Sequence, residues 1–202
     1  MARLILIRHG QSEAHPDVCL GQTDARLSAM GQGQIRLLRS NWRGLKPDFL
    51  MASDLSRASV SAEILGRGWH LPLAIDPRLR EVSFGRWEGK TWDEIEATDA
   101  VNLKPWFADW VKRSPPGGES FEALHRRTHD WLKEIMAKHN ERDLIAVVAH
   151  AGSIRSLLCH CLGIPLGFAF RVKVEFGRAS LIKATQGQFE VSYLNSSVVP
   201  AG

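Results

Sequence analysis

The sequence of 202 residues is poor in cysteine, and it has no long basic block and no long apolar run. Its three cysteines are an odd number, which argues against a disulfide framework and suits a reducing cytoplasm. Lys and Arg never form a block longer than a pair, so a nucleic-acid partner is not indicated. The apolar run 4–7 is ended by Arg8 and is too short for a signal peptide or a membrane span, so no membrane partner is expected.

What is present describes an ordinary globular protein. Hydrophobic residues make up 44% of the chain and charged residues 24%. The length suits one domain, residues 1–202, that can bury a core of its own. The formal net charge of +4 is mild and fits a small anionic ligand. The sequence does not decide between a monomer and a homodimer.

Short apolar runs alternate with helical patterns, which predicts an α/β fold around a mainly parallel sheet. Strands are predicted at 3–8, 48–53, 73–77 and 144–149. Helices are predicted to begin near Ser28, Leu55, Thr91, Glu119 and Gly152. Residues 169–195 predict a meander of three strands, "FRVKVEF", "SLIKAT" and "FEVSYLN", separated by Gly177 and Gly187 and in part antiparallel.

Charged and titratable residues follow three of the apolar runs. "LILI" ends in Arg8 and His9, "FLMASDLSR" leads to Arg57 in a first helical turn, and "LIAVVAH" ends in His150. Because parallel strands share a carboxyl edge where ligands bind, these side chains are expected to converge. Guanidinium groups match phosphate oxygens bidentately, so the pattern favours a phosphate site over a carboxylate site. Taken singly, each residue has a plainer interpretation as a packed histidine or a solvated arginine.

A metal site at Cys159, His160 and Cys161 is a weaker interpretation. Residues two apart on a helix point to different faces, so two buried thiols are the better prediction.

Six ordered motifs extend the pattern: "RHGQS", "GQTDARLSAMG", "ASDLSRASVSAEIL", "LREVSFGRWEG", "PPGGESFEAL" and "VVAHAGSIRSLL". In this order they resemble the histidine phosphatase superfamily, also called phosphoglycerate mutase-like, from about residue 3 to about residue 160. The resemblance implies a three-layer α/β/α sandwich with one antiparallel strand, and a phosphomonoesterase that needs no metal and no cofactor.

The resemblance also implies roles for single residues. His9 is expected to be the nucleophile that becomes a phosphohistidine, and a neighbouring arginine disfavours its protonated form. Arg8, Arg57 and His150 are expected to clamp the phosphoryl oxygens. Glu81 matches the general acid, with a surface ion pair to Arg78 or Arg80 as the plainer alternative.

The resemblance implies substrate-binding positions at Gly10, Ser12, His15, Gly21, Gln22 and Ala151. His15 stands where the family commonly has a phosphate-binding Asn, which leaves that contact open. Ala151 stands where Gly is usual, and it would be strained if the position required a positive φ. Arg155 is expected to brace its helix rather than touch substrate.

Within the superfamily, the chain lacks room for the insertion of the cofactor-dependent mutases, which favours hydrolysis. The second half resembles α-ribazole phosphatases of cobalamin assembly, and broad-specificity phosphatases share much of it. A phospho-ligand-binding protein without turnover is the alternative from another class. Trp87, Trp92, Trp106 and Trp110 are interpreted as core packing or, alternatively, as an aromatic lid over a ring of the substrate.

Overall fold

The computed structural model describes residues 3–140, 142–185 and 188–200. Its centre is a six-stranded sheet in the order β3-β2-β4-β1-β5-β6. The strands are β1 (Arg3–Arg8), β2 (Phe49–Ala52), β3 (Leu73–Ile75), β4 (Leu144–Ala149), β5 (Ala179–Thr185) and β6 (Gln188–Ser196). Strands β1 to β4 pair in parallel, whereas β5 pairs antiparallel with both β1 and β6. The predicted sheet, mainly parallel with one strand running against the rest, is confirmed.

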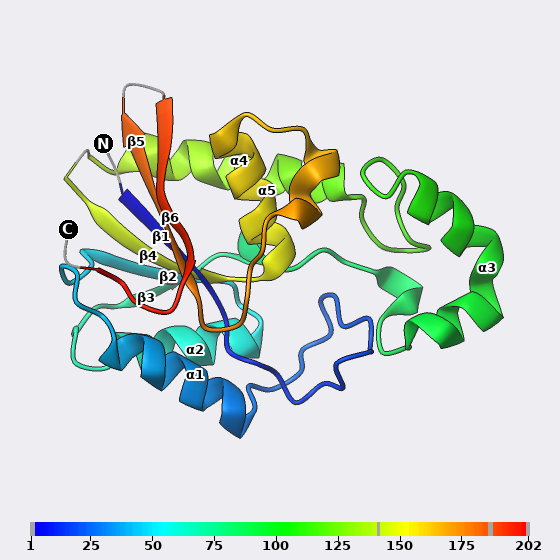
Figure 1. Ribbon diagram of the computed structural model, residues 1–202, viewed down its shortest axis with the longest axis horizontal. Helices are drawn as coiled ribbons and strands as arrows, with labels where there is room; N and C mark the ends of the chain where they lie inside the picture. The colour runs from blue at the N-terminus through cyan, green and yellow to red at the C-terminus, as the bar shows by residue number, and fades with distance from the viewer. Residues whose placement is uncertain (1–2, 141, 186–187, 201–202) are drawn as a thin grey trace.

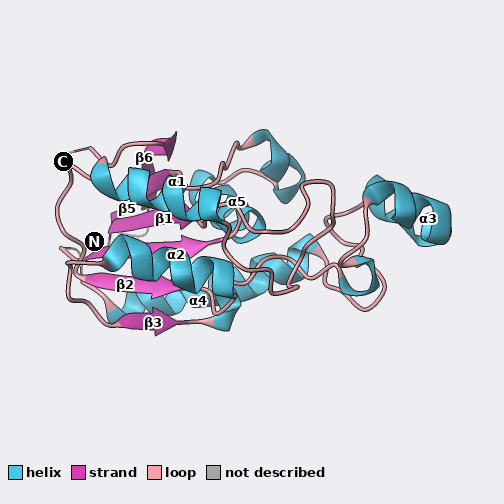
Figure 2. Cartoon of the chain, turned by 90° about the horizontal axis from the view of Figure 1, so that it is seen from below, coloured by secondary structure: helices cyan, strands magenta, loops and turns pink. Residues whose placement is uncertain are grey.

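Helices cover both faces of the sheet. Helices α1 (Ala29–Ser40) and α2 (Ser56–Gly66) lie on one face, and α4 (Phe121–Lys138) and α5 (Ala151–Leu162) lie on the other (Figure 1). Helix α3 (Trp92–Ala108) stands apart from both layers, beyond one end of the sheet (Figure 2). Short helices η1 (Pro77–Leu79), η2 (Gly85–Trp87) and η3 (Leu166–Arg171) lie in the connections. Within the part of the chain that the structure describes, none of the helices has the length and apolar character needed to cross a bilayer.

Alternation along the central strands builds the two cores. On β1, Leu4 and Leu6 join the apolar cluster under α4 and α5, and Ile5 and Ile7 join the cluster under α1 and α2. All six residues of β4 are buried, as expected for a parallel strand covered on both faces. These two clusters fix the register of β1 and β4, and therefore the position of whatever follows their carboxyl ends.

Residues 85–118, here called the cap, have a small core of their own. Trp87, Ile95 and Leu103 pack with Cys19, which comes from the loop after β1. Helix α3 begins with a capping box in which Thr91 and Glu94 exchange hydrogen bonds. The cap therefore packs as a unit distinct from the two clusters of the sheet.

Most predicted boundaries are close to the observed ones. Ser28, Leu55 and Thr91 are N-caps of their helices. The fourth predicted helix begins after Ser120 rather than at Glu119, because the Ser120 hydroxyl accepts from Ala123 N. Strand β3 ends at Ile75, two residues early, because η1 begins at Pro77.

The first strand of the predicted meander is wrong. Residues 166–171 form η3, and residues 172–178 pass through a bend at Val172 and a turn at residues 176–177 and lie outside the sheet. The alternation of apolar residues was present, but the carbonyls of Val172 and Val174 accept from arginine side chains instead of from a neighbouring strand. Gly177 has a φ of 63° and makes the predicted turn into β5. Gly187 lies outside the described residues.

Candidate active site

His9 lies directly after β1, beside the end of β4. Its backbone N–H donates to Ala149 O at 3.0 Å, and its ring Nδ1 lies 2.6 Å from Gly10 O. A carbonyl oxygen only accepts, so Nδ1 is assigned the proton and Nε2 keeps a free lone pair. The residue is 4% exposed. Burial lowers the pKa of His9 well below its ordinary value, and Arg57 and Arg8 lower it further, so the ring is uncharged.

Arg8 precedes His9 and is held by the chain before β5. Its Nη1 donates to Val174 O at 2.7 Å, and its guanidinium lies 3.6 Å from the centre of the Phe176 ring. Its buried Nε has no hydrogen-bond partner among the described residues. Burial lowers the pKa of Arg8 to about 10, so the group remains a cation at neutral pH.

Arg57 lies in the first turn of α2 and is only 1% exposed. Its Nη1 donates to Thr23 O at 2.8 Å and its Nη2 to Gly21 O at 2.7 Å. The buried Nε has no partner among the described residues. Arg57 therefore holds the loop around Gly21 and keeps one N–H donor free at the site.

His150 is the residue between β4 and α5. Its ring lies behind that of His9, with 4.8 Å between ring centroids, and its Nε2 is 2.9 Å from Ser53 Oγ. Its Nδ1 is buried and has no partner in the described chain. Burial, and then His9, lower the pKa of His150 well below its ordinary value. The site thus holds two uncharged imidazoles next to two guanidinium groups.

Glu81 reaches the same spot from the loop after η1. Its carboxylate accepts from Val82 N at 2.9 Å and from Gly152 N, in the first turn of α5, at 3.0 Å. A helix N-terminus favours a negative charge. A Cβ on Gly152 would come within 2.1 Å of Glu81 Oε1, so this glycine is required for the contact. The alternative of a surface ion pair is wrong, because Arg78 pairs with Asp76 and Glu134, and Arg80 with Asp54.

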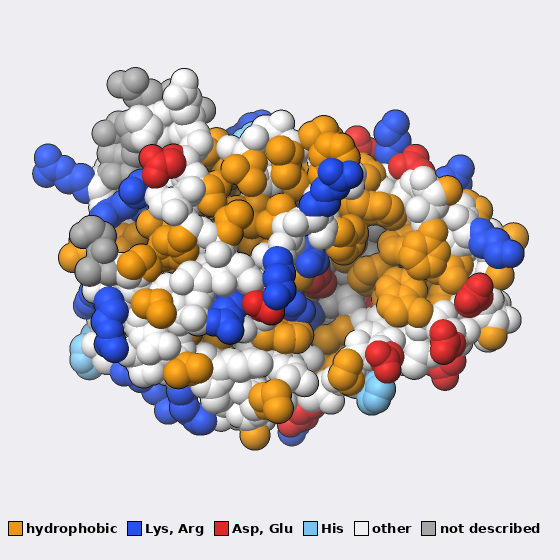
Figure 3. Space-filling view, viewed as in Figure 1, with side chains coloured by type: hydrophobic (Ala, Val, Ile, Leu, Met, Phe, Trp, Pro, Cys, Tyr) orange, Lys and Arg blue, Asp and Glu red, His pale blue; other side chains and the backbone are white. Residues whose placement is uncertain are grey.

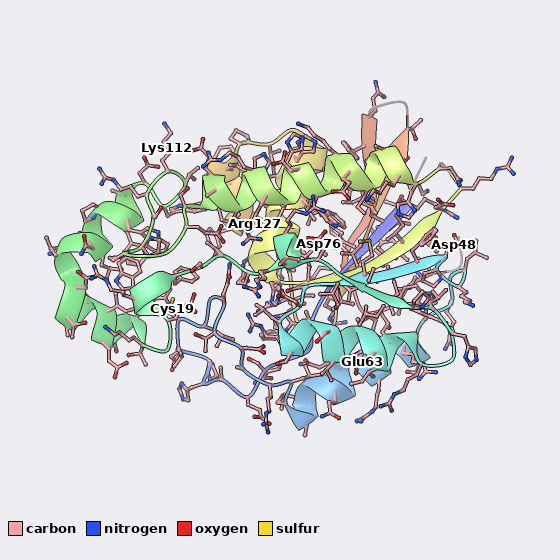
Figure 4. All side chains as sticks on the ribbon, turned by 180° about the vertical axis from the view of Figure 1, so that it is seen from behind. Cys19, Asp48, Glu63, Asp76, Lys112 and Arg127 are labelled. Carbon is pink, nitrogen blue, oxygen red and sulfur yellow. The ribbon has the colours of Figure 1, made fainter. Side chains whose placement is uncertain are left out.

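Arg127, on α4, holds the chain that leads to Glu81 (Figure 4). Its Nη1 donates to Arg78 O at 2.7 Å and to Arg80 O at 2.8 Å, and its Nη2 donates to Glu81 O at 2.8 Å. Glu119 pairs with the same guanidinium and also accepts from Ser83 N at 3.0 Å. Arg127 was not predicted as a site residue, although a basic pair on an otherwise amphipathic helix was a possible signal.

A cavity of about 490 Å³ lies between the sheet and the cap, and its floor is formed by Arg8, His9, Arg57 and Glu81. Figure 3 shows it as a hollow with charged side chains inside and hydrophobic side chains gathered around its rim. Its wall includes seven aromatic residues: Phe84, Trp92, Trp106, Trp110, Phe121, Phe170 and Phe176. Trp87 instead is 1% exposed in the cap core and donates to Asp99 Oδ2. Trp87 therefore fits the core-packing interpretation, and the aromatic lid formed by the other three tryptophans stays a prediction.

Several predicted site residues line the cavity, namely Arg8, His9, Ser12, His15, Gly21, Arg57 and Glu81. The side chain of His15 is 69% exposed and lies near Asp17. His150 is enclosed behind His9 and does not form part of the wall.

Three predicted substrate-binding positions do not form part of the wall. Gly10 is packed against α1, where a Cβ would meet Gly31 O at 2.3 Å. Gln22 donates to Glu81 O at 3.0 Å and so supports the backbone at Glu81 from outside the cavity. Ala151 is 6% exposed and begins α5, and it is not among the described residues with a positive φ. The alanine is therefore unstrained.

The three cysteines are free and buried, as predicted for Cys159 and Cys161. Among residues 3–140, 142–185 and 188–200, no three His, Cys, Asp or Glu side chains are arranged to hold a metal ion.

The chain is similar to known phosphatases over nearly its whole length. The family described as "Histidine phosphatase superfamily (branch 1)" matches residues 4–197. The adenosylcobalamin/alpha-ribazole phosphatase of Escherichia coli (strain K12) is 30% identical over 198 residues, which cover 98% of this chain and 97% of that protein. The glucosyl-3-phosphoglycerate phosphatase of Mycobacterium tuberculosis (strain ATCC 25618 / H37Rv) is 31% identical over 172 residues, which cover 81% of this chain and 77% of that protein. A crystal structure of the alpha-ribazole phosphatase from Shigella flexneri superposes with a TM-score of 0.92 at 29% identity, over 99% of both chains.

Proposed function

Because the chain belongs to the histidine phosphatase superfamily, we propose that it hydrolyses phosphomonoesters through a phosphohistidine formed on His9. In the first step, His9 Nε2 attacks phosphorus and the bond to the ester oxygen breaks. Glu81 gives its proton to the departing oxygen, which leaves as an alcohol. In the second step, Glu81 takes a proton from water, the water oxygen attacks phosphorus, and His9 leaves with its lone pair restored.

The clamp is the observation that carries the proposal. Arg8 Nε, Arg57 Nε and His150 Nδ1 are buried around His9, and each lacks a partner in the described part of the chain. Buried polar nitrogens are normally hydrogen-bonded. Phosphoryl oxygens held at this place can accept from both guanidinium groups, and the two cations supply the charge that such a transfer requires. We therefore propose a reaction that proceeds without a metal ion.

We propose α-ribazole 5'-phosphate as the substrate. Two of the similar proteins described above are named as α-ribazole phosphatases. The aromatic wall supports the same substrate, because a flat heterocycle can stack on tryptophan and phenylalanine rings. We further propose that residues 1–202 form one domain and that the enzyme acts in the cytoplasm, where its three free thiols stay reduced.

The test combines a substrate panel with a nucleophile variant. With a chelator present, the wild-type protein should hydrolyse p-nitrophenyl phosphate. Of three metabolites, α-ribazole 5'-phosphate, glucosyl-3-phosphoglycerate and phosphoserine, the first should have the highest kcat/KM. His9→Ala should lower turnover at least about a thousandfold and abolish covalent phosphoryl capture after acid-free quenching. His129→Ala, in the middle of α4 and outside the cavity wall, is the control and should change neither turnover nor phosphoryl capture. A protein that binds these esters without turnover would support the alternative of a non-catalytic phospho-ligand-binding protein.

A further inference from the structure

The segment 170–176, which leads from the end of η3 to the turn at Gly177, runs between the nucleophile and the aromatic wall. Its even-numbered residues contact the site one after another. Phe176 lies against His9, with 5.5 Å between ring centroids, and Val174 O accepts from Arg8. Val172 O accepts from Arg155 Nε at 3.0 Å, and Phe170 packs on Trp110 with 4.7 Å between ring centroids. Along this segment, the parts of the cavity therefore follow one another in the order nucleophile, phosphoryl clamp, Arg155 and the Trp110 side of the aromatic wall.

Arg155 lies at the middle of this order. It is one turn after Gly152 on the same face of α5, next to the helix end that holds Glu81. Its guanidinium lies 5.1 Å from the centre of the Phe170 ring, and the residue lines the cavity. Only its Nε donates to a described residue, so its Nη1 and Nη2 remain available to a molecule in the cavity.

The spacing along the segment gives the distance from the clamp. Val172 and Val174 are two residues apart, so the chain between the two arginine-binding carbonyls spans at most about 7 Å. A group that contacts Arg155 is therefore one small ring beyond the phosphoryl group and just before the aromatic wall. A carboxylate at this place would face Glu81 when that residue is ionised, whereas neutral hydroxyl oxygens accept from a guanidinium without that repulsion.

We propose that Arg155 is a specificity-determining residue that donates hydrogen bonds to the hydroxyl oxygens of a sugar joining the phosphoester to an aromatic ring. This inference rests on the proposed phosphatase activity, and it says which residue binds the part of the substrate between the phosphoester and the ring. It replaces the expectation that Arg155 only braces its helix. The site then binds three parts of the substrate in order. The phosphoryl group lies at Arg8 and Arg57, the sugar hydroxyls at Arg155, and the apolar ring at Trp110 and Phe170.

The test compares two primary phosphate esters that differ in hydroxyl groups, ribose 5-phosphate and 1-pentyl phosphate. Arg155→Leu should lower kcat/KM about 10- to 100-fold for ribose 5-phosphate, mainly through KM, as expected for lost hydrogen bonds to a charged donor. The same variant should change kcat/KM for 1-pentyl phosphate by no more than about twofold, because this ester has no hydroxyl group for Arg155 to bind. Arg171→Leu is the matched control, because Arg171 also stacks on a phenylalanine, 4.2 Å from the Phe168 ring centre, but lies outside the cavity wall.

Inhibition by inorganic phosphate separates this role from a structural one. Phosphate should bind the Arg155→Leu variant as tightly as the wild type, because the clamp is unchanged. Equal losses on both esters together with weaker phosphate inhibition would mean that Arg155 only supports residues 172–174 under Arg8, and would overturn the inference. Unchanged selectivity between the esters would also overturn it. If the wild type hydrolyses neither ester nor p-nitrophenyl phosphate, the proposed function itself fails and this inference fails with it.

Discussion

At the scale of single residues, each buried charge of the site is fixed by backbone carbonyls rather than by a carboxylate. Arg57 is held by the carbonyls of Gly21 and Thr23, and Arg8 by that of Val174. Carbonyl oxygens orient a guanidinium without neutralising it. The full positive charge therefore remains available to a bound anion, which an ion pair inside the protein would reduce.

Arg57 should not be replaceable by lysine. One ammonium cannot donate to two carbonyls and to a phosphoryl oxygen in a fixed plane. Losing such a contact costs about 2.7–4 kcal/mol in the transition state, so Arg57→Lys should lower kcat/KM about a hundred- to a thousandfold. The affinity for vanadate, measured by competitive inhibition, should fall in parallel with kcat/KM.

Arg36→Lys on the exposed face of α1 is the control for Arg57→Lys and should retain wild-type kinetics. If Arg57→Lys kept wild-type kcat/KM and vanadate binding, Arg57 would have no part in the clamp.

At the scale of elements, α5 connects the two halves of the proposed reaction. His150 precedes its first turn, and Gly152 N in that turn holds the Glu81 carboxylate. One helix terminus thereby sets the position of a clamp residue relative to the proposed acid. A small displacement there changes proton transfer without removing a catalytic group.

Gly152→Ala should impair proton donation more than phosphoryl binding. The added Cβ, 2.1 Å from Glu81 Oε1, must push the carboxylate away. Alkyl phosphates need a protonated leaving oxygen, whereas nitrophenolate leaves without one, so kcat should fall at least about tenfold more for 1-pentyl phosphate than for p-nitrophenyl phosphate. Gly33→Ala is the control, because a Cβ there meets nothing within 4 Å.

Equal losses on both leaving groups in Gly152→Ala would contradict the assignment of Glu81 as the proton donor. The Gly33→Ala variant should be slightly more stable than wild type in urea, since alanine favours the helix by about 1 kcal/mol over glycine.

Much of the fold could be predicted because the signals were local. The apolar run of β1 followed by Arg8 and His9 indicates both a buried strand and a residue at its end. The segment 170–176 was predicted wrongly as a strand, because alternation indicates which side chains are buried and not which groups hydrogen-bond to the backbone. The role of Gly152 was also invisible, since its neighbour Glu81 comes from a distant part of the chain. Contacts of this kind appear only when the chain is folded.

At the scale of the whole molecule, folding keeps His9 and His150 uncharged in the interior. Their pKa values lie well below the ordinary 6.5 in the folded protein, mainly through burial. Below pH 6.5 the unfolded chain takes up protons that the folded chain does not, so acid favours unfolding. His125 and His160, half-buried between α4 and α5, have pKa values lowered by burial and act in the same direction.

The free energy of unfolding should therefore begin to fall as the pH drops below about 6.5, and should continue to fall until the folded-state pKa values are passed. Each fully buried histidine contributes up to about 1.4 kcal/mol per pH unit in this window. Urea unfolding between pH 8 and pH 5 measures the slope, and His150→Gln should reduce it by about one such contribution.

Gly33→Ala is the control for the pH series, because it removes no titratable group, and its slope should match that of the wild type. Identical slopes for wild type and His150→Gln would show that His150 takes up its proton equally in both states.

The cap, with its own cluster around Trp87, Ile95 and Leu103, is separated in its packing from the strands that position His9. Mutations that accumulate in residues 85–118 can therefore reshape the aromatic wall while the register of β1 and β4 is preserved. In an evolving lineage, the part of the cavity wall that Trp92, Trp106 and Trp110 supply can therefore change while the chemistry at the sheet is retained. For a protein engineer, the same division makes the cap the segment to randomise or to graft from a relative when a new leaving group is wanted.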